Sequence, residues 1–227
     1  MRGKLIVVEG TDCSGKETQT NLLIKKLNEK NISVVKFQFP NYESPTGKII
    51  GGPYLGKEKI CSSWFEEGAV NVDPKVASLY YAADRLYNIS KINEMLNRGV
   101  NVILDRYTYS NMGHQGGKIE NKEERLKMYE WLEELEFKFL KLPIPDIKIF
   151  LHMPYKYSLI LKSNCKDSPD EHEKNENHLK NAEQAYIEIA DKYNFKTIKC
   201  YKNDEIKTIE EIHDELYNYV FDKLKNI

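Results

Sequence analysis

Residues Gly10 to Lys16 read G-T-D-C-S-G-K and directly follow the apolar run Leu5-Ile6-Val7-Val8. The pattern G-x-x-x-x-G-K between an expected strand and an expected helix is that of a phosphate-binding P-loop. The two glycines allow the backbone to aim successive N–H groups at phosphate oxygens, and the helix N-terminus adds partial positive charge. This stretch therefore predicts a protein that binds a nucleoside triphosphate.

We expect the phosphates of ATP to meet nine consecutive residues, namely Gly10, Thr11, Asp12, Cys13, Ser14, Gly15, Lys16, Glu17 and Thr18. Glu17 stands where this loop normally carries a Ser or Thr whose hydroxyl binds magnesium. A carboxylate is also a hard oxygen ligand for Mg²⁺. A solvated acid in the first helical turn, favoured by the helix dipole, is the alternative interpretation of Glu17.

Strand-like and helix-like segments alternate along the chain. Strands are expected at 4–8, 33–37, 100–104, 147–152 and 195–199, and helices at 15–28, 73–97, 122–140, about 177–193 and 205–224. Residues 40–71 are rich in loop-forming residues. This alternation is typical of a parallel sheet covered on both faces. We therefore predict an α/β, three-layer P-loop NTPase fold with a parallel five-stranded sheet, in a single domain over 1–227.

Composition excludes several classes of protein. The 227 residues are 41% hydrophobic and 30% charged, with a net charge of −1, as in a soluble globular enzyme without general attraction to nucleic acid or membranes. The four cysteines are scattered, which argues against a disulfide framework or a zinc site and indicates a reducing, cytoplasmic location. No signal peptide and no membrane-length apolar run is apparent.

Three further segments suggest a second phosphate site. They are Phe39 to Lys48, Leu79 to Arg85 and Asp105 to Asn111. Ligands of a doubly wound sheet bind at the carboxyl ends of strands, so Asp105-Arg106 is expected beside the P-loop. Tyr81 precedes Arg85 by one helical turn, which suits either a platform for a nucleobase or a core aromatic.

The chain resembles the thymidylate kinase family over nearly its whole length. The resemblance rests on the P-loop followed, in this order, by the segments F-P…G-K, A-A-D-R and D-R-Y-x-x-S-N. The resemblance implies a phosphotransferase that moves the γ-phosphate of ATP to dTMP, giving dTDP for dTTP synthesis. It also implies Mg²⁺ as cofactor, ATP and dTMP as substrates, a homodimer, and a short lid at about 155–177.

The resemblance implies dTMP contacts at Asp12, Phe39, Pro40, Tyr81, Arg85, Arg106, Ser110, Asn111, His114 and Gln115. Asp12 would hold the sugar 3′-OH, and Tyr81 would stack on thymine. Asn111, with Ser110, would face the pyrimidine edge. His114 stands where the family usually places an aromatic that disfavours a 2′-OH, and a cation at a helix end is the alternative.

The phosphates are expected to be bound by cations on both sides of the reaction. Lys16 would serve ATP, and Arg85 and Arg106 would serve the dTMP phosphate. Glu17 and Asp105 are the expected metal ligands. Asp105 would orient Arg106 or magnesium-bound water, because an ionised acceptor phosphate needs no strong base; a local Asp105–Arg106 ion pair is the alternative.

The sequence departs from the family where a catalytic arginine is expected. The P-loop position holds Cys13, and the polar segment 162–177 contains lysines but no arginine. We hypothesise that one or more of the lysines at 162, 166 and 174 substitute. With Lys162 and Lys166, the expected catalytic set is Lys16, Asp105, Arg106, Lys162 and Lys166. Gln38 replaces an arginine of some family members, and His172 is interpreted as a surface residue.

Two other functions are compatible with these motifs. One is a kinase for another pyrimidine monophosphate or a nucleoside. The other is a catalytically weak P-loop protein that only binds nucleotide, which Glu17 and the missing arginine favour. The presence of Arg85, Asp105 and Arg106 together argues against the nucleotide-binding protein.

One stripe of the helix expected over 73–97 is apolar, with the spacing i, i+3, i+4, i+7. It suits either the core or a dimer interface and consists of Val76, Leu79, Tyr80 and Ala83.

Overall fold

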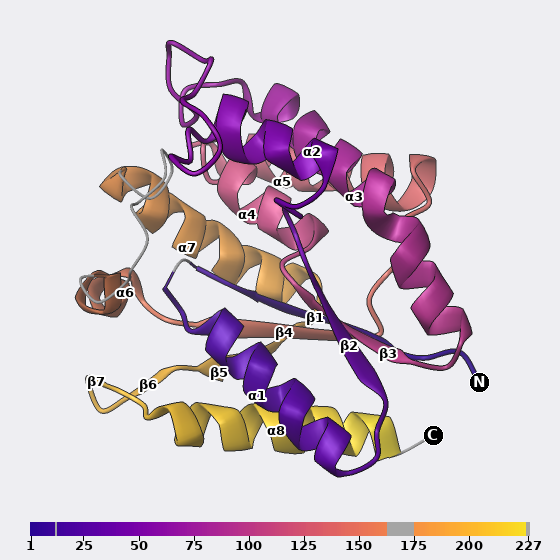
Figure 1. The fold of residues 1–227 in the computed structure, drawn as a ribbon. Coiled ribbons are helices and arrows are strands. Elements are labelled where there is room, and N and C mark those ends of the chain that lie inside the picture. The colour runs from indigo at the N-terminus through magenta and orange to yellow at the C-terminus, as the bar shows by residue number, and fades with distance from the viewer. Residues whose placement is uncertain (12, 163–174, 226–227) are drawn as a thin grey trace.

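The computed structural model describes residues 1–11, 13–162 and 175–225. Its main sheet has five parallel strands in the order β2-β3-β1-β4-β5 (Figure 1). The strands are β1 Leu5–Gly10, β2 Val34–Gln38, β3 Asn101–Asp105, β4 Ile147–His152 and β5 Lys196–Lys199. The predicted parallel five-stranded sheet is thereby confirmed. The order places the carboxyl ends of β1 and β3 side by side, so the P-loop lies next to the segment that follows β3.

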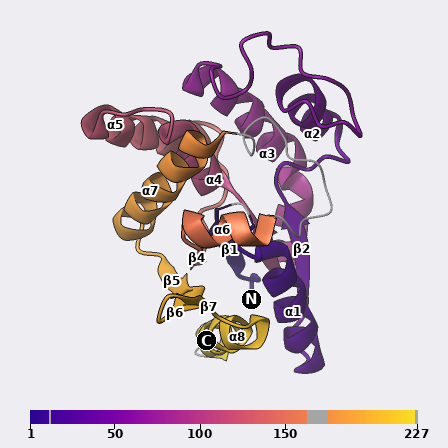
Figure 2. The same cartoon turned by 90° about the vertical axis from the view of Figure 1, so that its left-hand side faces the viewer.

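Helices cover both faces of this sheet (Figures 1 and 2). One face carries α1 Lys16–Glu29 and α8 Ile209–Lys225, and the other carries α3 Pro74–Asn97, α4 Thr108–Gly116, α5 Lys122–Glu133 and α7 Glu176–Lys192. Side chains of β1 alternate between the two cores: Ile6 and Val8 pack with the α1/α8 side, whereas Leu5 and Val7 pack with the other side. A strand buried on both faces explains the unbroken apolar run before the P-loop.

The long helix α3 begins as its sequence predicts. The Asp73 side chain accepts hydrogen bonds from the N–H groups of Lys75 and Val76, and Pro74 occupies the first helical position. Two turns after α3's start, Tyr81 and then Arg85 enter the region above the carboxyl ends of the strands. Beyond the end of α3, Gly99 adopts a φ of +80°, which a residue without Cβ adopts at little cost.

Several parts of the chain differ from the expectation. The segment 40–71 contains α2 Pro45–Ile49 and a π-helical turn, η1 Ile50–Tyr54. Helix α4 forms directly after β3, and the helix expected over 122–140 becomes α5 followed by a second π-helical turn, η2 Glu134–Phe139. A short hairpin of β6 Tyr201–Lys202 and β7 Glu205–Ile206 precedes α8. Its turn residues Asn203 and Asp204 both have positive φ, as a tight two-residue hairpin requires.

The segment after α2 builds a small core of its own against α3. Its buried apolar residues are Ile50, Tyr54, Leu55, Ala69 and Val72, which pack with Ala77. Figure 1 shows this segment standing over α3 and α4, away from the sheet. None of the helices in the described parts of the chain is long and apolar enough to cross a membrane.

Candidate active site

The P-loop connects β1 to α1 in the geometry that the sequence predicts. Gly15 adopts a φ of 79° at the N-cap of α1. A Cβ on Gly10 would lie 2.8 Å from the Leu151 carbonyl oxygen, so only glycine fits there. The buried Lys16 Nζ donates to the carbonyl oxygens of Gly10 at 2.9 Å and Thr11 at 2.7 Å. The ammonium group is therefore held at the loop, where it can meet phosphate.

The other expected ATP contacts occupy different environments. Ser14 is buried, Cys13 is half-buried with a φ of 57°, and Glu17 and Thr18 are exposed on the first turn of α1. Asp12 lies outside the described residues. The sequence-based roles of these residues stay predictions.

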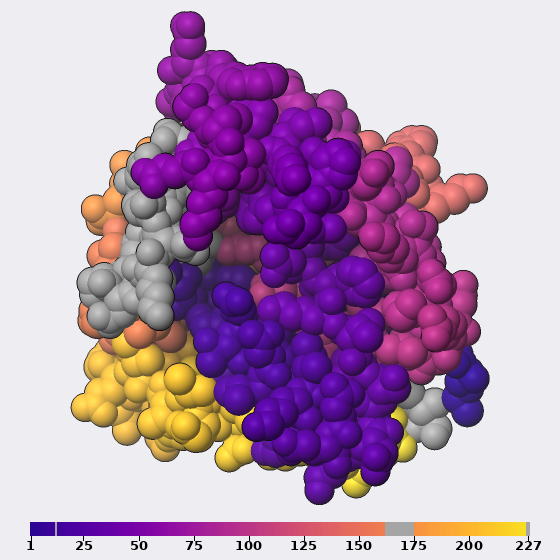
Figure 3. Space-filling model, viewed as in Figure 1, coloured from indigo at the N-terminus to yellow at the C-terminus, as the bar shows by residue number. Residues whose placement is uncertain are grey.

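One cavity of about 340 Å³ opens beside the P-loop, in the hollow that Figure 3 shows between the residue 50–60 region above and the N-terminal segments below. Every described residue expected to bind dTMP lines it. These nine residues are Phe39, Pro40, Tyr81, Arg85, Arg106, Ser110, Asn111, His114 and Gln115. Glu17 also lines it, so the cavity reaches the start of α1. Its volume suits a small organic ligand.

Sequence reasoning missed four residues that line this cavity. They are Tyr42, Leu55, Lys57 and Tyr107. Leu55 and Lys57 belong to the segment after α2, for which the sequence suggested no role. Because this segment folds back over α3, it forms one wall of the cavity. Only the three-dimensional packing of Tyr54 and Leu55 could have indicated that position.

Arg106 is the point at which the P-loop and the cavity meet. Its Nη1 lies 3.5 Å from the Gly10 carbonyl oxygen, 3.4 Å from Ser110 Oγ and 3.1 Å from His114 Nε2. The residue has a φ of +66°, an unfavourable conformation for a side chain with a Cβ. Such strain is concentrated at functional sites, where surrounding contacts maintain it.

The backbone next to Arg106 is held by Glu9, a residue that sequence reasoning missed. Its fully buried carboxylate accepts from the N–H groups of Tyr107 and Ser110 and, at 2.5 Å, from Ser110 Oγ. Tyr186 Oη on α7 donates to the same carboxylate at 3.4 Å. Burial raises the pKa of Glu9, against the lowering effect of these donors and of Arg106. Its position directly before Gly10, inside an apolar strand, was the available signal.

Asp105 and Arg106 lie in different surroundings. Asp105 ends β3, and its Oδ2 lies 3.6 Å from Nζ of Lys36 on the neighbouring strand β2. The ion pair that the structure gives Asp105 is thus with Lys36, a pairing across neighbouring strands that no sequence motif indicates. Arg106 turns instead toward the cavity and helix α4.

Arg85 is held by a carboxylate that the sequence did not reveal. Its Nε and Nη2 donate to the two oxygens of Glu136 at 2.5 and 2.6 Å, and both side chains are buried. Burial opposes the charge on Arg85, but the Glu136 carboxylate outweighs it and raises the pKa of the guanidinium. The expected grip of Arg85 on a phosphate therefore competes with an existing bidentate ion pair.

Tyr81 lies in the cavity lining and also in a core, and His114 lies in the cavity lining and also at a helix end. Tyr81 lines the cavity and also packs edge-to-face on Tyr54, with ring centroids 5.9 Å apart. His114 lies in the last turn of α4, yet its ring contacts Arg106 and stacks on His178 of α7 at 5.6 Å. Both side chains are half-buried.

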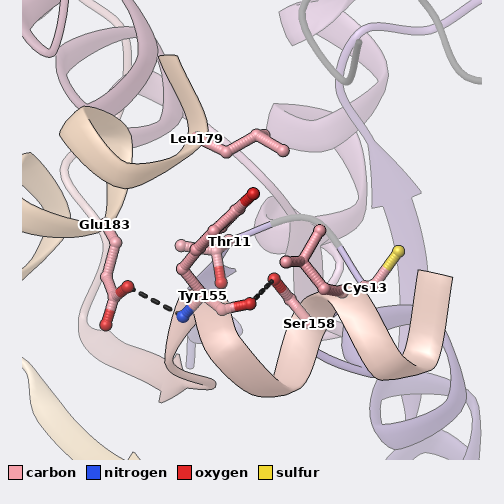
Figure 4. Close-up of a pocket in the computed structure, with 7 residues that line it drawn as sticks. Thr11, Cys13, Tyr155, Ser158, Leu179 and Glu183 are labelled. Carbon is pink, nitrogen blue, oxygen red and sulfur yellow. Dashed lines mark hydrogen bonds between the residues drawn. The ribbon is translucent and has the colours of Figure 1, made fainter. Parts of the chain in front are cut away.

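A second, much smaller pocket of about 10 Å³ lies on the other side of the P-loop, between Thr11, α6 Tyr155–Lys162 and α7 (Figure 4). Glu183 accepts from the Tyr155 N–H at 2.8 Å, and Ser158 Oγ donates to the Tyr155 carbonyl at 2.8 Å. These contacts fix the start of the segment expected to be the lid. Lys162 ends α6, whereas Lys166 and His172 lie outside the described residues.

The chain can be compared with known proteins. A family model described as "Thymidylate kinase" matches residues 8–215. A thymidylate kinase of Schizosaccharomyces pombe is 30% identical over 220 residues, which is 96% of this chain and 92% of that protein. The chain belongs to the thymidylate kinase family.

Other members of the thymidylate kinase family match over similar lengths. A probable thymidylate kinase of Methanocaldococcus jannaschii is 33% identical over 98% of this chain and 96% of its own. The solved structure of thymidylate kinase from Candida albicans superposes with a TM-score of 0.75 at 26% identity, covering 98% of this chain and 92% of that one. The α/β P-loop kinase fold is thereby confirmed.

A thymidylate kinase uses ATP and generally requires a divalent metal ion. Within the described residues, no group of three or more His, Cys, Asp or Glu side chains is arranged to hold a metal by itself. Mg²⁺ typically binds one or two carboxylates together with substrate phosphates and water, so a dedicated cage is not needed. The carboxylates of Glu17 and Asp105, at the start of α1 and the end of β3, fit that requirement by their chemistry.

Proposed function

We propose that this chain transfers the γ-phosphate of ATP to dTMP, yielding ADP and dTDP. The observation that carries the proposal is the contact of Arg106 with both halves of the site. Its guanidinium meets the Gly10 carbonyl of the P-loop and also lines the cavity that contains the expected dTMP residues. A phosphate bound there would lie next to the loop that binds the donor phosphates.

Buried unpaired polar atoms on two residues that line the cavity support a nucleobase as the occupant. Among the described residues, the buried Oδ1 of Asn111 and both amide atoms of Gln115 have no hydrogen-bond partner. Buried polar atoms normally have partners, so these amides call for a ligand that offers both donors and acceptors. The edge of a pyrimidine base has both, and Phe39 and Tyr81 provide apolar ring surface beside it.

Phosphoryl transfer requires positioning and neutralisation of negative charge more than covalent chemistry. In the proposal, Lys16 binds the β- and γ-phosphates of ATP, and Arg106 binds the phosphate of dTMP. Arg85, already paired with Glu136, acts at the base end of the cavity instead of at the phosphate. Asp105 orients groups at the phosphates and abstracts no proton, because the attacking phosphate oxygen is already ionised.

Glu17 and Asp105 are the side chains that would hold Mg²⁺ in this proposal. The ion would reduce the negative charge between the two phosphates.

Asp12 keeps its proposed role at the sugar 3′-OH. Lys162 and Lys166 keep their proposed role in place of the catalytic arginine. Methionine substitutions at Lys162 and Lys166, one at a time, should lower turnover more than about threefold for at least one position. A cytoplasmic location is likewise part of this proposal.

A coupled assay of ADP release tests the proposed substrates. The protein receives ATP, magnesium and, in turn, dTMP, dUMP, dCMP, UMP and thymidine, with Lys16→Ala as the inactive control. Turnover on dTMP above all others, lost in Lys16→Ala, is the expected result. Preference for another acceptor would favour the related pyrimidine kinase, and ATP binding without turnover on any acceptor would favour the binding module.

A further inference from the structure

The fully buried carboxylate of Glu136 binds Arg85, a residue of the cavity lining. Glu136 lies on η2 and is fully buried, whereas Phe139 at the end of the same turn is 76% exposed. The other charged residues of this turn, Glu134 and Lys138, are exposed. A buried carboxylate is costly unless it is paired and hydrogen-bonded, so a site that retains one has a use for it.

Glu136 connects two residues that line the cavity. Besides Arg85, it accepts from Thr108 Oγ1 at 2.9 Å and from Asn111 Nδ2 at 3.3 Å. Asn111 Nδ2 also donates to the carbonyl oxygen of Ser78 at 3.2 Å. Carboxylate and carbonyl oxygens only accept, so the amide atom facing both of them must be the NH₂ group. The Asn111 oxygen is thereby turned away from Glu136, and it is the buried atom without a partner.

The Glu136 carboxylate also orients the guanidinium group of Arg85. Its Nε and Nη2 are bound to Glu136, and Nη1 takes no part in that bidentate contact. Because Arg85 lines the cavity, the fork held by Glu136 leaves a donor for a ligand there. Next to it, Asn111 offers an acceptor. The wall of the cavity thus has a fixed order of donor and acceptor.

We propose that Glu136 is a positioning residue that determines base specificity. By holding the Asn111 amide and the Arg85 fork, it selects a pyrimidine that presents a ring N–H beside a carbonyl oxygen. Thymine and uracil have this pattern, whereas cytosine has a ring nitrogen acceptor beside an amino group. Cytosine would set acceptor against acceptor at Asn111 and donor against donor at Arg85. This inference rests on the proposed function and assigns its base selectivity to a residue outside the cavity lining.

Selectivity between two bases that arises from buried hydrogen bonds is large. A site built to hydrogen-bond a ligand rejects an analogue with the wrong polar groups by several orders of magnitude, because buried groups are left unpaired. Replacing the carboxylate by an amide puts an NH₂ group among donors. The Asn111 amide is then no longer fixed in one orientation, and it can turn its own NH₂ toward the cavity.

The test compares kcat/KM for dTMP and dCMP in the wild type, Glu136→Gln and Thr108→Val. Thr108→Val removes a different hydrogen bond to Glu136 and keeps the carboxylate, so it is the matched control. We expect the dTMP-to-dCMP ratio to fall by roughly tenfold or more in Glu136→Gln, with KM for ATP unchanged, and to persist in Thr108→Val. A wild-type ratio retained in Glu136→Gln overturns the inference.

A second variant covers the case in which Glu136→Gln does not fold. Arg85→Met combined with Glu136→Leu replaces the buried ion pair by apolar groups, which proteins often tolerate. A greater loss of the dTMP preference in this double variant than in Arg85→Met alone supports the inference, and an equal loss in the two overturns it. A wild type that prefers some acceptor other than dTMP contradicts the proposed function itself, so the two failures are distinguishable.

Discussion

At the scale of single residues, the site depends on a strained arginine held by a buried acid. Arg106 has a left-handed backbone and contacts the P-loop, Ser110 and His114. Glu9 accepts from the backbone of the two residues that flank the start of α4, Tyr107 and Ser110. The acid thus fixes the loop in which Arg106 stands, although it does not itself line the cavity.

Glu9→Gln should make the protein more stable at neutral pH. Burial raises the pKa of Glu9 above its usual value of 4.5, so this carboxyl group is harder to ionise in the folded protein than in the unfolded chain, and folding is disfavoured at pH 7. This penalty is absent below pH 4.5 and grows as pH rises through the folded-state pKa. The glutamine oxygen can still accept from the two backbone N–H groups.

Thermal unfolding of both proteins at pH 4.5 and pH 7.5 measures the effect, with the exposed Glu29→Gln as control. The gain in melting temperature should be larger at pH 7.5. An equal or smaller gain at pH 7.5 would show that the raised pKa of Glu9 does not destabilise the fold at neutral pH.

Glu17→Thr tests the second unusual residue of the P-loop. If the Glu17 carboxylate contributes to holding magnesium, its replacement by a hydroxyl should retain turnover of dTMP and shift the magnesium concentration for half-maximal rate by about threefold or more. A magnesium titration of both proteins at fixed ATP gives the answer. A superimposable titration returns Glu17 to the status of a surface acid, which its exposure on α1 also permits.

At the scale of elements, the strands and the long helices were predictable and the π-helical turns were not. The apolar run of β1, the Asp-Pro start of α3 and the glycine after it act through local sequence. In contrast, η1 and η2 contain residues that would suit an ordinary helix or loop. Tertiary packing of Tyr54 and the pairing of Glu136 with Arg85 accompany their geometry, and neither contact is visible in a local pattern.

The same distinction applies to the site. The nine described residues assigned to dTMP were found from motifs and do line one cavity. Glu9 and Glu136 were missed because each acts through contacts with residues far away in the chain, and Lys57 was missed because its segment has no motif that indicates a place in the cavity wall. The motif that contains Arg85 predicts a contact with phosphate. It contains no sign of Glu136, whose carboxylate binds two of the three guanidinium nitrogens of Arg85.

Lys118→Met should loosen the segment that forms one wall of the cavity. Lys118 Nζ donates to the carbonyl oxygens of Ala69 at 2.8 Å and Val72 at 2.9 Å, and to Tyr54 Oη at 3.3 Å. Without these bonds, amide hydrogen exchange over residues 54–72 should accelerate. KM for dTMP should rise by about threefold to tenfold, because Leu55 lines the cavity.

Hydrogen exchange followed by mass spectrometry reports on that segment directly, with the exposed Lys122→Met as the matched control. Unchanged exchange over 54–72 in Lys118→Met would mean that the small core around Tyr54 holds the wall without this lysine.

At the scale of the whole molecule, α3 exposes apolar side chains that a second copy of the chain would cover. Val76 is 43%, Leu79 51% and Leu86 45% exposed, and they recur at the spacing of one helix face. Tyr80, expected on the same stripe, is half-buried in the small core beside Tyr54. We therefore propose a homodimer through the exposed face of α3.

Leu79→Asp should convert that dimer into a monomer, since the charge would be buried without a partner. Light scattering after size exclusion measures the mass at micromolar concentration. Ile144→Asp, which alters an equally exposed apolar residue elsewhere, should leave the dimer intact. A wild type with the mass of one 26.6 kDa chain would contradict the proposal.

The account as a whole claims that the P-loop and the cavity are the two halves of one phosphotransfer site. The most direct test follows the phosphate itself, using ATP labelled at the γ-position together with magnesium and dTMP. The label should appear in dTDP, with little in inorganic phosphate, and neither product should form in Lys16→Ala. Label that passes only to inorganic phosphate, at a rate independent of dTMP, would contradict the account.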